Sequence, residues 1–170
     1  MEKHEGLLEA LETAAHENTT EWERNLRLSQ AGDCVRKIAY NVLGVDRTES
    51  TTARRQRVFA FGDLIHDMLR KELVDAGFTG DIPLTKEAEG EVELFVKVAC
   101  GDDGPYGFTV TGHPDGVVDI DGEQMVLEIK SISPYGFREV VKTGPQEQHV
   151  AQASAYAKAM DLHTRFCSYT

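Results

Sequence analysis

Residues 112–130 read GHPDGVVDIDGEQMVLEIK, and this stretch decides the fold. Its Asp-Gly pair at 121–122 lies between two apolar-rich runs, which is a strong local signal for a two-residue β-hairpin turn. The turn sets the pairing of the two strands, so that Asp115 lies directly opposite Glu128 with Cβ atoms roughly 5 Å apart. Lys130 lies two residues beyond Glu128 and therefore points to the same face of the predicted sheet.

The opposed carboxylates of this hairpin predict a metal site. Two carboxylates that close repel each other unless a proton or a cation lies between them. Oxygen ligands at this separation suit a hard divalent ion such as Mg²⁺ or Mn²⁺. The ordinary alternative is a half-buried strand with a solvent-exposed outer face, on which Leu127 and Ile129 alternate with Glu128 and Lys130.

The composition indicates one globular domain over residues 1–170. The sequence contains no apolar run long enough to span a membrane and no signal-peptide pattern at its start, so we expect a cytoplasmic protein without a membrane partner. The three cysteines include no Cys-x-x-Cys pair, which argues against a zinc finger and against a disulfide framework.

The net charge of −11 argues against a generic nucleic-acid binder, but the charge is unevenly distributed. Residues 34–71 carry eight bases and four acids, and residues 129–170 carry five bases and three acids. These basic blocks flank residues 72–128, which carry fourteen acids and two bases. If the basic blocks meet in space, they form a basic path beside an acidic centre. The alternative is that each block is simply a solvated surface.

The periodicity of apolar residues predicts helices first, then a run of strands, then helices and a last strand. This order indicates an α/β or α+β sheet flanked by helices. The end of the sequence just after a strand leads us to expect either a further C-terminal piece or a partly ordered tail. The predicted helices cover residues 4–30, 34–43, 53–76, 134–142 and 145–160. The predicted strands cover residues 91–99, 106–112, 116–120, 124–131 and 164–169.

Gly62 and His66 lie one turn apart on one face of the helix predicted over 53–76. A glycine in the middle of a helix costs about 1 kcal/mol relative to alanine, which suggests that another part of the chain packs closely there. The imidazole of His66 would then be able to reach a cation. A half-buried histidine in an ordinary helix–sheet contact is the alternative.

Two further groups of polar residues are candidates for contact with a nucleotide. Gln148, Gln152 and Tyr156 recur every four residues on one face of the helix at 145–160, apart from its small apolar stripe, and offer donors, acceptors and a ring. Arginines at positions 54, 55 and 57 crowd the start of the long helix, where their charge is unfavourable beside the helix dipole unless an anion offsets it. Solvent-exposed surfaces without a ligand are the alternative for both groups.

Taken together, these pieces resemble the RecB-like branch of the PD-(D/E)xK nuclease superfamily. That branch has four short motifs in a fixed order along a helix, a strand, the next strand and a second helix. The matching positions here are Gly62 and His66, Gly112 and Asp115, Glu128-Ile129-Lys130, and Gln152 and Tyr156. The resemblance covers roughly residues 29–165 and implies a restriction-endonuclease-like core with a central mixed β-sheet, over residues 34–170, after an N-terminal helical extension at 1–33.

The run from Leu28 to Tyr40 also resembles the opening of phage and CRISPR-associated RecB-like exonucleases. In many of those proteins the first cysteine joins three C-terminal cysteines to hold an iron–sulfur cluster. Only Cys34 fits that role here, and Val35 replaces the usual proline. We therefore expect no iron–sulfur cluster in this chain as given, unless residues beyond 170 supply further ligands.

The resemblance implies a metal-dependent DNA exonuclease that hydrolyses phosphodiester bonds from DNA ends in recombination, repair or phage DNA processing. A non-catalytic DNA- or partner-binding module on the same fold and a restriction-type endonuclease are the alternatives. The implied partners are DNA ends, a recombination or annealing protein and further copies of the chain, within a bacterial or phage-infected cell.

The resemblance also implies a role for each candidate site residue. The implied ligands of Mg²⁺ or Mn²⁺ are His66, Asp115, Glu128 and the backbone carbonyl of Ile129. The implied catalytic residues are Asp115, Glu128, Lys130, Gln152 and Tyr156, where Lys130 acts on the attacking water while Gln152 and Tyr156 brace the site and touch the substrate strand. The candidates for DNA contacts are Arg36, Lys37, Arg54, Arg55, Arg57 and Gln148.

Overall fold

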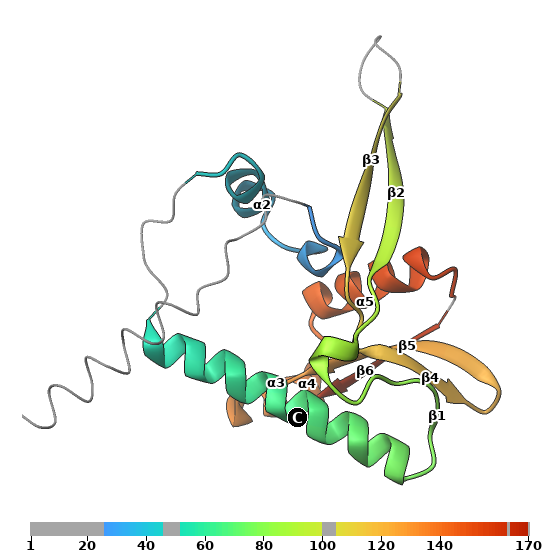
Figure 1. The fold of residues 1–170 in the computed structure, drawn as a ribbon. Coiled ribbons are helices and arrows are strands. Elements are labelled where there is room, and N and C mark those ends of the chain that lie inside the picture. Colours follow the sequence, from blue (N-terminus) through green and yellow to red (C-terminus); the bar gives the residue numbers. More distant parts are fainter. Residues whose placement is uncertain (1–25, 46–51, 100–104, 163, 170) are drawn as a thin grey trace, which may run out of the picture.

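The computed structural model describes residues 26–45, 52–99, 105–162 and 164–169 (Figure 1). Its centre is a four-stranded sheet in which β5 pairs with β4 on one side and with β6 on the other. The β1–β4 and β4–β5 pairs are antiparallel, whereas β5 and β6 are parallel, so the sheet is mixed. In spatial order, the strands are β1 (Thr79–Asp81), β4 (Gly116–Ile120), β5 (Glu123–Lys130) and β6 (Thr164–Tyr169).

The β4–β5 hairpin has the predicted register. Gly116 pairs with Leu127, and Ile120 pairs with Glu123 across a turn of two residues. The turn residues Asp121 and Gly122 both have positive φ, 56° and 83°, which is the backbone conformation that a type I′ turn requires. The local chemistry of the turn therefore sets which residues of the two strands share a face.

Both faces of β5 are covered, so the half-buried strand considered above is not what forms. On one face, Leu127 and Ile129 pack with Val118 and with partly buried leucines of α3 (Ala53–Asp75). On the other face, Val126 packs with residues of α5 (Glu147–Ala159). Burial on both faces explains why residues 126–129 are all buried. The arrangement confirms an α/β fold with helices flanking the sheet.

Local signals at their ends position the helices that flank the sheet. The side chain of Thr52 accepts a hydrogen bond from the N–H of Arg55 at the start of α3, and Gly77 follows the end of α3 with φ +91°. The helix α4 (Pro134–Thr143) begins with proline after the capping residue Ser133. A further helix, α2, spans Val35–Val42. Together with α5, these helices confirm four of the five predicted ones.

The remaining predicted helix, over 4–30, is wrong in its described part, and residues 1–25 lie outside the described residues. Leu28–Gln30 form a short 3₁₀ helix, η1, and Arg27 before it is extended with φ −122° and ψ 144°. Arg27 forms an isolated parallel bridge with Thr111, so pairing with a distant strand replaces helix here.

A separate two-stranded sheet, β2 (Val92–Ala99) with β3 (Pro105–Gly112), projects from the body of the molecule (Figure 1). Val110 of β3 joins the same buried cluster as Leu28 of η1 and Tyr156 of α5. The prediction placed these two strands correctly, but missed the short elements β1 and η2 (Lys86–Ala88).

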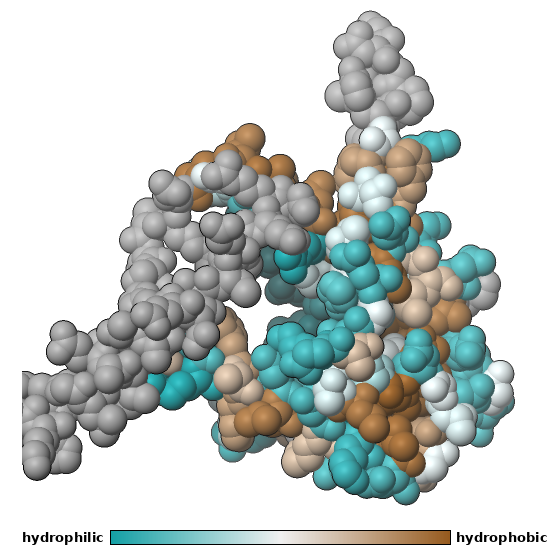
Figure 2. Space-filling view, in the orientation of Figure 1, coloured by the Kyte–Doolittle hydropathy of each residue, from teal (hydrophilic) through white to brown (hydrophobic). Residues whose placement is uncertain are grey.

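Part of the surface is apolar (Figure 2). The apolar residues of α3 only partly face the sheet. Leu69 packs against the core, whereas Val58, Phe61 and Met68 are exposed. Among the described residues, no helix is both long and apolar enough to cross a membrane.

We predict that Gly112→Ala destabilises the fold by about 1–3 kcal/mol, because overpacking of a filled core costs energy of that order. A Cβ at Gly112 would lie 2.9 Å from the Tyr156 ring and 3.0 Å from the Leu28 side chain. Urea unfolding measures the change. The matched control is Gly90→Ala, where a Cβ would meet nothing within 4 Å, and its stability should stay within about 0.5 kcal/mol. Equal stability of the two variants would contradict this packing.

Candidate functional site

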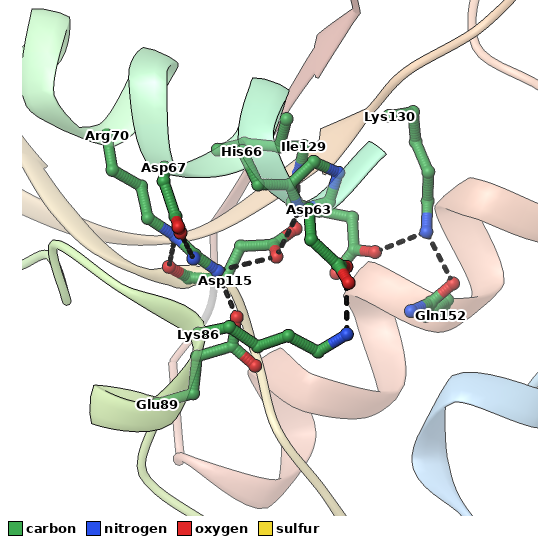
Figure 3. Close-up of polar contacts among 11 residues, drawn as sticks. Asp63, His66, Asp67, Arg70, Lys86, Glu89, Asp115, Ile129, Lys130 and Gln152 are labelled. Carbon is green, nitrogen blue, oxygen red and sulfur yellow. Dashed lines mark hydrogen bonds and ion pairs between the residues drawn. The ribbon is translucent and has the colours of Figure 1, made fainter. Parts of the chain in front are cut away.

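The residues predicted to form the metal and catalytic centre come together, in large part, where β4 begins and β5 ends, between α3 and α5 (Figure 3). Asp115 immediately precedes β4, and Glu128 lies near the end of β5; their exposed fractions are 8% and 2%. His66 reaches the site from α3, and Gln152 reaches it from α5 (Figure 3). The hairpin register thus places two acids in the interior, and the two flanking helices add polar side chains around them.

The carboxylate of Asp115 is held on both of its oxygens. Its Oδ1 lies 3.0 Å from Nδ1 of His66 and accepts a hydrogen bond of 2.9 Å from Nη2 of Arg70. Its Oδ2 accepts a hydrogen bond of 2.6 Å from the backbone N–H of Ile129. Because α3 and β5 both contribute donors, the orientation of this carboxylate is determined by the packing of the helix on the sheet.

The carboxylate of Glu128 is only half satisfied. Its Oε1 forms an ion pair of 2.5 Å with Nζ of Lys130, which also donates to Oε1 of Gln152 at 2.9 Å. Its Oε2 is buried and has no hydrogen-bond partner among the described residues. Burial, followed by the charge of Asp115, raises the pKa of Glu128 to about 7, and Lys130 offsets only part of this rise. A cation beside the open acceptor would favour the ionised form of Glu128, which burial disfavours.

The donors present fit a hard divalent ion. His66 Nδ1 and Asp115 Oδ1 lie at a hydrogen-bond distance of 3.0 Å, which two neighbouring octahedral ligands with bonds of about 2.1 Å would also have. The unpartnered Oε2 of Glu128 supplies a further oxygen, and carboxylate and carbonyl oxygens are the ligand types that suit Mg²⁺ and Mn²⁺. Among the residues that the structure describes, no group of three His, Cys, Asp or Glu side chains is already arranged to hold a metal ion. Glu128 is paired with Lys130 instead.

Arg70 is part of the site, and the sequence reasoning missed it. Its side chain is fully buried, and its Nε donates to the backbone carbonyl of Asp115 at 3.1 Å. It also donates to Asp67 at 3.2 Å and to Glu89. The available signal was its position four residues after His66, which puts a basic residue on the helix face that turns toward the sheet.

Gly62 has the close neighbour that its place in the helix suggested. A Cβ at Gly62 would lie 3.3 Å from Oγ of Ser131, the residue that follows β5. The bare backbone of α3 therefore lies against the end of β5. This contact brings His66, one turn further along the helix, over the carboxylates of the hairpin.

The stripe predicted on α5 does not form one exposed face. Tyr156 is 1% exposed and packs in the core beneath Gly112. Burial and the charge of Glu128 raise the pKa of Tyr156, which keeps its hydroxyl protonated. Gln148 is exposed and donates to Asp33 at 3.0 Å, whereas Gln152 accepts from Lys130 of the site.

The basic residues predicted to contact DNA are all exposed. Lys37 forms an ion pair of 2.6 Å with Asp33, the residue that also accepts from Gln148. Arg36 and the arginines at 54, 55 and 57 form no ion pair with any described residue. The last three lie at the start of α3, the helix that also carries His66.

Two other side chains bear on the predictions. His149 of α5 was not predicted; its Nδ1 lies 3.1 Å from the hydroxyl of Tyr169, and burial and the charge of Lys130 lower its pKa. The neutral ring is therefore favoured beside Lys130.

Cys34, which alone fitted a cluster ligand, is an exposed free thiol at the start of α2, and Cys100 lies outside the described residues.

Comparisons with known proteins support the fold and no more. No protein-family model matches the chain, and no curated protein matches it. Among solved structures, the crystal structure of SSO0001 is similar with a TM-score of 0.55 and 18% sequence identity. The match covers 98% of this chain and 71% of that one. At this identity, the likeness shows a shared fold.

We predict that Glu128→Gln changes how stability depends on pH in metal-free buffer. A glutamic acid of the unfolded chain titrates near 4.5, whereas Glu128 in the fold titrates near 7. The unfolded chain therefore loses its proton first, and the wild-type fold loses stability as the pH rises from about 4.5 to 7. Glutamine does not titrate. As the pH rises, the free energy of unfolding of the variant should therefore fall by about 1–3 kcal/mol less than that of the wild type.

Urea unfolding with a chelator at pH 5 and pH 8 measures this difference. The matched control is Glu139→Gln on α4, where the carboxylate is paired with exposed Lys142 at the surface. That control should follow the wild type across the range. Parallel curves for the wild type and Glu128→Gln would contradict the burial of an uncompensated carboxylate.

Proposed function

We propose that this chain is a metal-dependent DNA exonuclease that hydrolyses phosphodiester bonds from DNA ends. One observation carries the proposal: the buried Oε2 of Glu128 has no partner among the described residues, next to Asp115 and the ammonium group of Lys130. A cation site beside a fixed ammonium group suits a substrate that carries negative charge and gains more of it during reaction.

The residues that would hold the ion are Asp115, Glu128, His66 and the backbone carbonyl of Ile129. When bound, a divalent ion lowers the pKa of a coordinated water and neutralises charge on the scissile phosphate. Asp115 is ready for this role, because the N–H of Ile129 and the side chain of Arg70 fix its orientation before any ion arrives. Glu128 would bring the free acceptor that the fold leaves unsatisfied.

Lys130 is placed to act on the reacting groups. Two of its three N–H donors are engaged by Glu128 and Gln152, which fix the ammonium at the rim of the site with 21% of its side chain exposed. The third donor remains for a water or a phosphate oxygen. The ammonium would therefore orient the attacking water and stabilise the charge that develops on the phosphate.

The arginines at the start of α3 support DNA as the substrate. Arg54, Arg55 and Arg57 are exposed, and no described acid neutralises them. They would contact the phosphate backbone, so that binding is largely independent of sequence and depends on salt. The preference for ends rests on the resemblance to RecB-like exonucleases.

The test is a digest of end-labelled linear DNA and of covalently closed circular DNA, each with Mn²⁺, Mg²⁺ or a chelator. The proposal expects metal-dependent loss of label from the linear substrate while the circle stays intact. Cutting of the circle would favour a restriction-type endonuclease. No cleavage of either substrate with Mn²⁺, by protein that still binds DNA, would favour the non-catalytic module.

We expect Glu128→Ala and Lys130→Ala each to reduce cleavage by about 100-fold or more, since each removes a charged group from the reacting centre. Lys142→Ala is the matched control, because Lys142 pairs with an acid three residues away on the surface of α4. Initial rates on linear DNA measure the effect, with circular dichroism to verify folding. Wild-type rates in a folded Lys130→Ala variant would remove Lys130 from the chemistry.

We expect the double variant Arg54→Ala with Arg55→Ala to flatten the salt dependence of DNA binding. Each lost phosphate contact should reduce the slope of log K against log salt by about 0.7–0.9. Fluorescence anisotropy at several salt concentrations, in chelator, measures the slope. Arg138→Ala, a change of an exposed arginine on α4, is the control. An unchanged slope in the double variant would show that these arginines do not contact the DNA phosphates.

A further inference from the structure

Three carboxylates converge on the single guanidinium of Arg70 (Figure 3). Nη2 donates to Asp115 at 2.9 Å and to Glu89, and Nη1 donates to Asp67 at 3.2 Å. Arg70 has no exposed surface, and the side chains of Asp115 and Glu89 are 11% and 12% exposed. The Asp67 side chain is more open, with 34% exposed, so the cluster joins α3, the residue after η2 and the residue before β4 into one partly buried network.

The charges of this cluster need a cation at its centre. Acids this close repel each other, and each would resist ionisation if Arg70 were absent. A lysine would provide one point of charge, whereas the planar guanidinium meets three carboxylates and the carbonyl of Asp115 with separate N–H groups. The side chain thus does for these three acids what a bound ion does for its ligands.

Enzymes that use two divalent ions on a phosphate hold them about 3.5–4 Å apart. Beside Asp115, the side that faces Glu89 and Asp67 is already filled by Arg70. The other oxygen of Asp115 accepts from the N–H of Ile129, and the open acceptor belongs to Glu128, the residue opposite Asp115 in the hairpin register.

We propose that Arg70 takes the place of a second cation beside Asp115 and restricts the site to one divalent ion. This inference rests on the proposed function, because it concerns the metal site of that function. Arg70 is a positioning residue here: it acts through Asp115 and does not itself touch the substrate. Without its positive charge, Asp67, Glu89 and Asp115 become a set of oxygen ligands for a second ion.

The test counts Mn²⁺ bound by the full chain, using isothermal titration and electron paramagnetic resonance. We expect one Mn²⁺ in the wild type and two in Arg70→Met, with the two ions magnetically coupled because they lie close together. Arg70→Lys keeps the positive charge and should bind one. Lys71→Met is the matched control, since it also removes a cation of α3 and frees a carboxylate, that of Asp75, but on the exposed surface. It should bind one.

Each outcome decides the matter. A coupled pair of Mn²⁺ ions in the wild type would overturn the inference and leave the proposed function intact. One ion in both the wild type and a folded Arg70→Met would also overturn it. No ion in any variant would contradict the proposed function and the inference together. If Arg70→Met does not fold, Arg70→Gln, which keeps donors without the charge, should bind two ions, and one ion there would refute the role.

Discussion

The rest of the structure depends on two carboxylates, Asp115 and Glu128, held side by side in the interior. Their mutual repulsion and loss of hydration disfavour the ionised pair. Arg70, His66 and a backbone N–H compensate Asp115, whereas Lys130 compensates only one oxygen of Glu128. The remaining unsatisfied acceptor is the feature that a divalent cation would complete. The β4–β5 hairpin and the helices α3 and α5 hold these two groups together.

Several pieces of the site were predictable because they depend on local rules. The Asp-Gly turn determines the register of β4 with β5, and that register alone puts Asp115 opposite Glu128. Gly62 in the middle of a helix implied a close neighbour, and Ser131 is that neighbour. Helical spacing then put His66 on the same face. In each case the signal that allowed the prediction lies within one short stretch of sequence.

Other pieces were not predictable because their causes lie far apart in the sequence. Arg70 is explained only by Asp115 and Glu89, which come from separate segments. The strand β1 has only three residues, Thr79–Asp81. Its middle residue must be glycine, because a Cβ on Gly80 would clash with β4, and this gives the segment the amino-acid composition of a turn. Spacing on α5 likewise does not show that Tyr156 lies beneath Gly112. The restriction-endonuclease-like core remains a proposal beyond the α/β fold.

Crystals grown with MnCl₂ and measured at the manganese absorption edge test the central claim most directly. The account predicts an anomalous peak within bonding distance of Asp115, His66 and the Oε2 of Glu128. An absence of density there, with Glu128 still paired only with Lys130 at saturating Mn²⁺, would contradict it.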